Sequence, residues 1–287
     1  MMDSRFASFD VSNLLNRTFL LEAFVLSNVA FLIADIYVAH SFNAFAHWGE
    51  YVPLVYAAAG TVALGLSVGL QWARHEGLPK LSWWIGEVVG WGGVAVGFAG
   101  LVWHLEAWFL ETTTLKSLVY SAPFVAPLAF AGLGLLLLMN RRTESESAEW
   151  AQWILFMAWG GWVGNFALSL VDHAQNAFFY ATEWIPVVSS ALAVGALVVL
   201  LVSRPQPPTF RFAYGVLALN VVVGLLGFVL HIAPLWTEPS DASLWNQIVF
   251  GAPVFAPLLF VDLAVLSVLG VWSLHEAVEA SEADVAV

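Results

Sequence analysis

The chain has 287 residues, of which 60% are hydrophobic and 10% charged, with a formal net charge of −12 and no cysteine. Its mean hydropathy of +0.81 indicates a membrane protein. The lack of cysteine excludes disulfides, thiolate metal sites, iron–sulfur clusters and a cysteine nucleophile. The sequence also lacks nucleotide-binding, dinucleotide-binding and hydrolase motifs, so we expect no nucleotide and no nucleic acid among its partners.

Eight apolar runs are long enough to cross a bilayer, which takes about 20 apolar residues. A segment surrounded by lipid must satisfy its own backbone hydrogen bonds, so we predict that all eight are α-helices. Polar breaks rich in turn-forming residues separate them. In chain order the predicted spans are 18–39, 53–73, 83–104, 118–139, 150–172, 185–203, 211–232 and 249–272.

The second half of the chain repeats the first. Segment 35–53 aligns with 168–186, and segment 121–128 aligns with 251–258. The matched residues are His40 and His173, Asn43 and Asn176, Glu50 and Glu183, Gly97 and Gly224, Gly100 and Gly227, His104 and His231, and Glu111 and Glu238. We therefore predict an all-α polytopic membrane protein with eight transmembrane helices. These form two tandem four-helix units, 18–140 and 150–274, related by a pseudo-two-fold axis along the membrane normal.

The basic residues predict the orientation. Eight of the nine lysines and arginines fall on one side of the predicted spans, and the positive-inside rule makes that side cytoplasmic. Eight is an even number of spans, so both termini lie there, including the polar tails 1–13 and 275–287. We expect a multi-pass protein of the cell membrane whose main surrounding is the lipid bilayer.

The four repeated histidines end spans one, three, five and seven, on the predicted extracytoplasmic side. In an antiparallel four-helix bundle the first and third helices lie diagonally across the core. We therefore expect His40 to approach His104, and His173 to approach His231, so that each pair could share one centre. Anchoring of polar rings in the headgroup region is the alternative explanation.

Haem b is the first candidate for that centre. In each unit two glycines precede the second histidine by four and seven residues, which places them on the same helical face. Such a strip leaves room for a flat macrocycle beside a bis-histidine iron, although small residues also let membrane helices pack closely. The predicted haem-binding residues are His40, His104, His173, His231, Gly97, Gly100, Gly224 and Gly227.

A divalent metal ion is the alternative centre. Imidazole and carboxylate together suit zinc, copper or non-haem iron. The predicted outer face has a single lysine and no arginine to neutralise haem propionates, which favours a cation. Glutamates close to the start of a helix also act as caps, which is the other explanation for Glu50 and Glu183. The predicted metal ligands are His40, His104, His173, His231, Glu50, Glu111, Glu183 and Glu238.

Two further features bear on function. Glu87 and Asp262 lie inside predicted spans without a match in the other copy. One interpretation is that they are protonated carboxyls packed between helices, and the other is that they belong to a proton path. In the repeated A-P-x-x-A-P sequences, 122–127 and 252–257, we expect the first proline to start a helix and the second to kink it, shaping a cavity.

Eight spans in two fused four-helix units, each with one histidine pair near the outer face, resemble haem A synthase and related duplicated membrane haem proteins. That family carries its histidines on even-numbered spans in a His-Arg signature. Here they end odd-numbered spans and no His-Arg dipeptide occurs. The resemblance therefore concerns the layout of the fold, and no residue role is carried over.

The sequence as a whole predicts an integral membrane haem-b or metal-binding protein with a redox role, served by an electron-transfer or membrane-complex partner. Two alternatives from other classes remain open. One is a transporter or ion-handling protein that uses the His/Glu groups as an entry site. The other is a non-catalytic subunit of a membrane complex.

Overall fold

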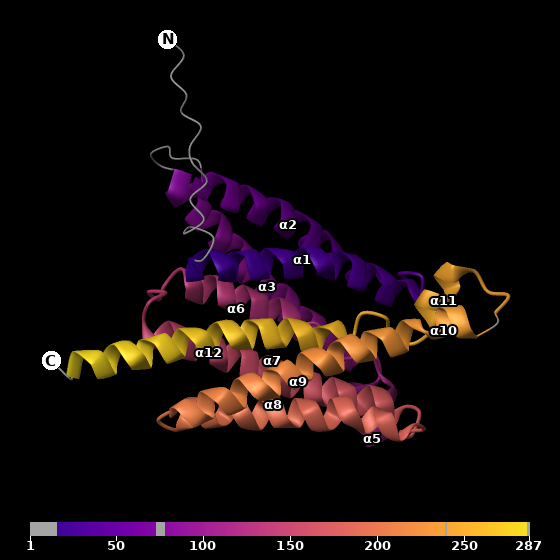
Figure 1. The fold of residues 1–287 in the computed structure, drawn as a ribbon. Helices are drawn as coiled ribbons and strands as arrows, with labels where there is room; N and C mark the ends of the chain where they lie inside the picture. The colour runs from indigo at the N-terminus through magenta and orange to yellow at the C-terminus, as the bar shows by residue number, and fades with distance from the viewer. Residues whose placement is uncertain (1–15, 73–77, 239, 286–287) are drawn as a thin grey trace, which may run out of the picture.

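The computed structural model describes residues 16–72, 78–238 and 240–285 (Figure 1). All regular elements in this part of the chain are helices. The eight main helices are α1 (Arg17–Ser41), α2 (Tyr51–Trp72), α3 (Leu78–Glu106), α6 (Leu128–Asn140), α7 (Ala148–Ala174), α8 (Trp184–Val202), α9 (Pro207–Ile232) and α12 (Leu258–Val285). The short helices are η2 (Trp48–Glu50), α4 (Phe109–Thr112), α5 (Leu115–Tyr120), η3 (Ala181–Glu183), α10 (Pro234–Thr237) and α11 (Leu244–Phe250).

Seven of the described helices are long and apolar enough to cross a membrane, and the eighth main helix, α6, is not. The protein is therefore an all-helical multi-pass membrane protein. The N-terminal half (α1 to α6) and the C-terminal half (α7 to α12) each form one group of packed helices (Figure 1). In each group the neighbours follow the same order around a ring, with α3 against α6 in the first and α9 against α12 in the second. Helix α1 also contacts α11 and α12, which joins the two halves.

The predicted spans four and eight differ from the structure. Instead of one helix over 118–139, the chain forms α5, a non-helical turn at 121–127, and α6, which is about 20 Å long at 1.5 Å per residue. The second half repeats this break with α11, a turn at 251–257, and α12. The prediction that the first proline starts each helix and the second kinks it is wrong. Both prolines lie in the turn, and each helix begins directly after the second one. The predicted C-terminal tail from residue 275 continues α12 as far as Val285, whereas 1–13 lies outside the described residues.

Glycines allow the broken helices to approach their neighbours. A Cβ atom on Gly97 would lie 2.6 Å from the backbone nitrogen of Ala131, and one on Gly134 would lie 2.4 Å from the carbonyl oxygen of Gly90. In the second half, a Cβ atom on Gly224 would lie 2.8 Å from the carbonyl oxygen of Pro257. Small residues at such crossings let membrane helices pack backbone to backbone. These contacts fix α6 against α3 and α12 against α9.

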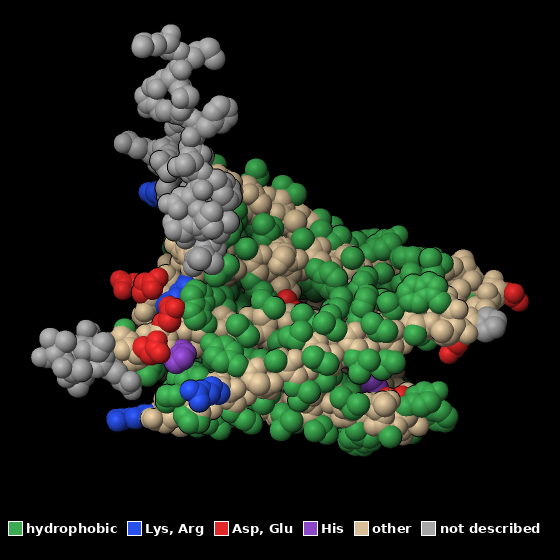
Figure 2. All heavy atoms as spheres, in the orientation of Figure 1, with side chains coloured by type: hydrophobic (Ala, Val, Ile, Leu, Met, Phe, Trp, Pro, Cys, Tyr) green, Lys and Arg blue, Asp and Glu red, His purple; other side chains and the backbone are tan. Residues whose placement is uncertain are grey.

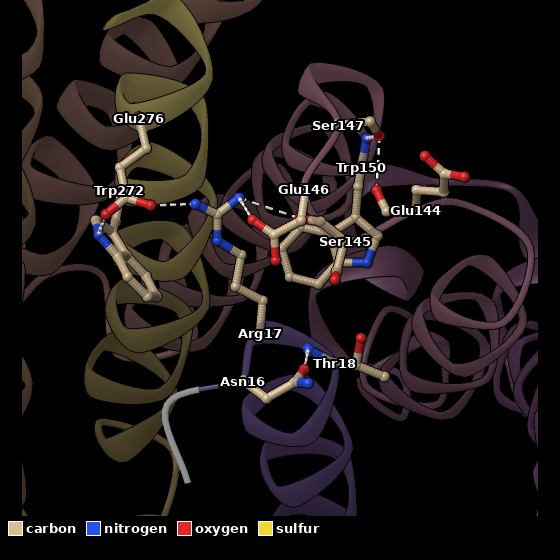
Figure 3. Close-up of polar contacts among 10 residues, drawn as sticks. All are labelled: Asn16, Arg17, Thr18, Glu144, Ser145, Glu146, Ser147, Trp150, Trp272 and Glu276. Carbon is tan, nitrogen blue, oxygen red and sulfur yellow. Dashed lines mark hydrogen bonds and ion pairs between the residues drawn. The ribbon is translucent and has the colours of Figure 1, made fainter. Parts of the chain in front are cut away.

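The molecule has two polar ends separated by a hydrophobic middle (Figure 2). We call the end that holds Arg17, Arg141 and Arg142 the arginine end, and the end that holds His40, His104, His173 and His231 the histidine end. At the arginine end the linker between the halves is held in place (Figure 3). The buried Arg17 side chain donates to Ser145 O (3.1 Å), pairs with Glu146 and Glu276, and lies over the ring of Trp272.

A second ionic group lies beside this one. Arg141 pairs with Glu22 at 2.9 Å, with both side chains buried, and Arg142 pairs with Glu87 at 2.6 Å. Burial lowers the pKa of the Arg141 guanidinium, and the nearby carboxylates of Glu22 and Glu87 act in the opposite direction. Glu87, which the sequence placed inside a span as a protonated carboxyl or part of a proton path, is thus the partner of an arginine.

Gly86 makes room for Arg141, so we expect Gly86→Ala to destabilise the protein. The added Cβ would lie 1.9 Å from an Arg141 guanidinium nitrogen and would force that side chain away from Glu22. Separating a buried ion pair leaves uncompensated charge, and we expect a loss of roughly 1–3 kcal/mol. Thermal unfolding in detergent measures it. Gly65→Ala is the control, because a Cβ there meets nothing within 4 Å. Equal stability of the two variants would contradict the packing described for Gly86.

Candidate functional site

The histidine end is built around the same backbone turn in both halves. An Asn-Ala-Phe sequence follows the end of helix α1 and of helix α7, at residues 43–45 and 176–178. The alanine and phenylalanine have left-handed backbone angles in both copies, with φ of 57° and 53° at Ala44 and Phe45, and 58° and 54° at Ala177 and Phe178. Two successive non-glycine residues in this region are strained, which is common at functional sites. Each turn brings its asparagine back toward the following glutamate.

That asparagine holds one oxygen of the glutamate. Asn43 Nδ2 donates to Glu50 Oε1 at 2.8 Å, and Asn176 Nδ2 donates to Glu183 Oε1 at 2.9 Å. The second oxygen, Oε2, is buried without a hydrogen-bond partner in both glutamates. A buried unpaired carboxylate oxygen is costly, and here it occurs at matched positions of the two halves.

Aromatic rings pack against the first histidine of each half. The Phe45 ring lies 5.8 Å from that of His40 and 4.8 Å from that of Tyr51, between centroids. In the second half the Phe178 ring lies 6.2 Å from His173 and 3.9 Å from Trp184. The strained turn therefore places an aromatic ring that restricts the imidazole on one side.

All four repeated histidines direct Nδ1 at a backbone carbonyl oxygen. The contacts are His40 with Glu50 O (3.2 Å), His104 with Pro123 O (3.0 Å), His173 with Ser169 O (2.8 Å) and His231 with Pro253 O (2.8 Å). A carbonyl oxygen only accepts, so Nδ1 must carry the proton and donate it. In a neutral ring Nε2 then has a free lone pair. In residues 16–72, 78–238 and 240–285, no hydrogen bond or ion pair reaches Nε2 of these histidines.

The turns that break spans four and eight take part in this arrangement. The carbonyls of Pro123 and Pro253 belong to non-helical backbone, which needs partners at membrane depth. Each accepts from one histidine and from a turn amide, Ala126 N at 3.1 Å and Ala256 N at 3.3 Å. His104 and His231 thus stabilise the turns, and the turns fix the orientation of the imidazoles.

The predicted approach of His40 to His104 is confirmed, with ring centroids 6.3 Å apart and an angle of 64° between the ring planes. The predicted approach of His173 to His231 in the second half is not confirmed. The described part of that half has no ring contact like the one between His40 and His104, because His173 bonds to its own helix through Ser169. The first pair is therefore the closer of the two.

The other predicted ligands lie further away. Glu111 in α4 and Glu238 at the end of α10 are exposed, and in the described chain neither forms a hydrogen bond or ion pair with a histidine. Within the same residues, no group of three or more histidine, aspartate or glutamate side chains is arranged so that it could hold a metal ion. The preformed donors in the described chain are thus the two close imidazoles of His40 and His104, and the backbone carbonyl of Glu50 accepts from the first of them.

The four predicted haem-strip glycines face the broken helices. A Cβ on Gly100 would lie 2.7 Å from Pro127 Cβ, and one on Gly227 would lie 2.9 Å from Pro257 Cβ. Gly97 and Gly224 face the same helices, as described above. The space beside these glycines is filled by protein, which favours their role in helix packing. Two open surface grooves among the described residues, about 310 Å³ along Trp184, Leu192 and Leu219 and about 410 Å³ along Trp153, have no histidine in their walls.

Sequence reasoning assigned no role to Asn43, Asn176 and the proline carbonyls. The duplication contained a signal for the asparagines, since both copies kept Asn-Ala-Phe three residues after the histidine. A backbone carbonyl leaves no such signal, because any residue supplies one.

Fold and site together define an all-helical multi-pass membrane protein with a histidine–glutamate group at the same end of each half. No protein-family model, curated protein or solved structure matches the chain.

Proposed function

We propose that this protein binds one transition-metal ion in each half, at the histidine end, through two imidazole Nε2 atoms. The described side chains do not form a complete three-ligand group, so a glutamate joins as the third ligand only when its side chain moves toward the imidazoles. The observation that carries the proposal is the set of four imidazoles whose Nδ1 atoms all donate to backbone carbonyls. Metal-ligating histidines almost always donate their other N–H in this way, because the bond fixes the tautomer and raises the basicity of the ligating nitrogen.

Distance supports a shared ion in the first half. Two imidazoles on one metal have ring centroids about 5–6.5 Å apart, since metal–nitrogen bonds are near 2 Å. The 6.3 Å between His40 and His104 falls in that range. In the second half, His173 would have to leave Ser169 for the rings to come equally close. The first centre is therefore the better organised.

The unpaired oxygen of Glu50 or Glu183 is the candidate third ligand. An asparagine already holds the other oxygen, which leaves one oxygen for a cation. Two imidazoles and one carboxylate suit zinc, copper and non-haem iron. Copper or iron would support the redox role expected from the sequence, whereas zinc would not.

Haem b is less well supported than a small ion. The ring separation in the first half would also suit two imidazoles on one haem iron. However, Pro127 and Pro257 fill the space beside the glycines that a macrocycle was expected to occupy. A single ion needs no such space.

A matching architecture is part of the proposal. We propose eight crossings in two tandem four-helix units, with α5 plus α6 and α11 plus α12 as the broken fourth and eighth crossings. Support comes from the same ring of helix neighbours and the same Asn–Glu and His–carbonyl bonds in both halves. We further propose that the arginine end with both termini is cytoplasmic.

Metal analysis of the purified protein, isolated without chelators, tests the proposal together with its absorption spectrum. We expect up to two equivalents of zinc, copper or iron and no haem spectrum. A Soret band with sharp bands on reduction would show that the bound cofactor is haem and not a single ion. Protein that is colourless and binds no added metal would contradict the proposal and leave the ion-handling or non-catalytic roles.

The orientation predicts opposite labelling of two single-cysteine variants, which is a clean test because the native chain has no cysteine. We expect an impermeant thiol reagent to label Asp241→Cys in whole cells and to label Glu144→Cys only after lysis. Both side chains are exposed, so burial does not protect either position. The reverse pattern would invert the proposed topology.

Ion handling is a second candidate, favoured by the broken helices. Discontinuous membrane helices form substrate and ion sites in many transporters, where unwound carbonyls and helix ends provide ligands. Here the two turns contact the same histidines that form the proposed centres. Metal flux into proteoliposomes distinguishes transport from a bound, resident ion.

A further inference from the structure

A carboxyl group in the middle of the membrane remains outside the proposed metal centres. Asn28 is the twelfth residue of α1, about 17 Å from Arg17 and about 20 Å from Ser41 at 1.5 Å per residue. Its Nδ2 donates to Asp262 Oδ1 at 2.8 Å. Asp262 reaches this depth because α12 begins only at Leu258, after the turn that breaks span eight. The hydrogen bond therefore joins the two halves near mid-membrane.

The neighbours of Asp262 in sequence show which way it faces. A Cβ on Gly224 of α9 would meet Val261 at 3.0 Å, and one on Gly161 of α7 would meet Leu263 at 2.5 Å. Val261 and Leu263 thus contact α9 and α7, which leaves Asp262 directed at α1. Phe31 of α1 also packs edge-on against Phe255 of the turn, with centroids 5.1 Å apart.

The surroundings of the carboxyl contain no counter-charge in the described chain. Of the groups that α1, α7 and α9 contribute there, the neutral Asn28 amide is the one that acts on Asp262. A carboxylate at this depth with a single neutral partner is expensive, whereas the protonated form is tolerated. Asp262 is also partly exposed, so a lipid-soluble reagent can reach it.

We propose that Asp262 and Asn28 form a proton-binding site at the junction between the two halves. The Asn28 amide donates to either form of the carboxyl, and it stabilises the ionised form more strongly. This contact joins α1 to α12. Gain or loss of the proton therefore changes the strength of a hydrogen bond that holds the two halves together. The site goes beyond the proposed metal centres and does not depend on them.

Dicyclohexylcarbodiimide tests the site, because this lipophilic reagent modifies protonated carboxyls. The acid adds across one C=N bond, so that a carboxyl oxygen bonds to the central carbon and the acid proton moves to nitrogen. An acyl shift from oxygen to nitrogen then gives a stable N-acylurea with no atom lost. Mass spectrometry of the α12 peptide from the wild-type protein reports the modification.

We expect wild-type Asp262 to be modified near neutral pH and the modification to fall as pH rises, because only the protonated form reacts. Asp262→Asn should lose the label from that peptide, and the exposed Asp241 should stay unmodified. Asn28→Ala removes the amide that stabilises the ionised form. The fall in labelling should then move to higher pH by at least about one unit.

Three outcomes would overturn the proposal. The first is no modification of Asp262 at any pH in folded protein, when denatured protein is modified. The second is modification that does not change with pH, which would mean a carboxyl fixed in its neutral form. The third is an Asn28→Ala profile identical to that of the wild type.

Discussion

Replacing Gly97 by leucine is expected to prevent α3 from packing against α6. A Cβ at this position already comes within 2.6 Å of a backbone nitrogen and 3.0 Å of the Pro127 carbonyl oxygen. Neither atom can move without moving α6, so the helices must separate. Overpacking by a few atoms costs roughly 1–3 kcal/mol, and leucine adds more. We expect Tm in detergent to fall by about 5–10 °C or folded protein to be lost.

Gly132→Leu is the matched control, because it lies on α6 where a Cβ meets nothing within 4 Å. Gly224→Leu and Gly215→Leu form the corresponding pair on α9, with contacts at 2.8 Å and none within 4 Å respectively. A comparable loss of stability in variant and control would mean that leucine itself destabilises the helix, whatever it packs against. No loss of stability in either would contradict the close approach of the helices.

His104→Ala is expected to remove metal from the first half and His231→Ala from the second. Each substitution deletes one of the two proposed imidazole ligands. Changes that only disturb the groups around a metal already lower its affinity about 10–100-fold. We expect at least about a 100-fold loss of affinity at one centre, with the other retained. Metal titration followed by competition with a chelator measures both classes of site.

His275→Ala is the control for this experiment. His275 lies at the arginine end, stacked on Phe210 with ring centroids 4.4 Å apart, and contributes nothing to the proposed centres. Its loss should leave two equivalents of bound metal. Metal binding that survives in the double variant His104→Ala/His231→Ala would rule out these histidines as ligands.

Most of the helices were predictable because hydropathy reports them directly. The predicted span 150–172 corresponds to α7, Ala148–Ala174, and 211–232 corresponds to α9, Pro207–Ile232. Spans four and eight were predicted as single helices because their apolar runs continue through the prolines. Hydropathy depends on side chains alone. It therefore does not show that the backbone at these prolines is non-helical, or that the proline carbonyls accept hydrogen bonds from histidines on another helix.

The site was predictable in its residues and only partly in its geometry. Duplication identified the four histidines, and the order of helices in a bundle predicted that His40 would meet His104. The duplication also showed that Glu50 and Glu183 occupy matching positions. The loop glutamates Glu111 and Glu238 matched equally well, but sequence does not determine how far a loop reaches.

The glycines illustrate the same limit. Their spacing placed Gly97, Gly100 and His104 on one face of a helix, but it left open what lies against that face. In the structure the neighbour is α6, since Pro127 and Ala131 fill the space. A periodic pattern predicts a face, and only the tertiary packing determines whether a helix or a cofactor occupies it.

X-ray absorption at the metal edge tests the central claim most directly. In protein loaded with the metal that co-purifies, we predict scattering from two imidazole rings per metal at nitrogen distances near 2 Å, with additional oxygen ligands. Scattering from the four in-plane nitrogens of a porphyrin would identify the centre as a haem. A metal shell of oxygen alone, without imidazole scattering, would contradict the account.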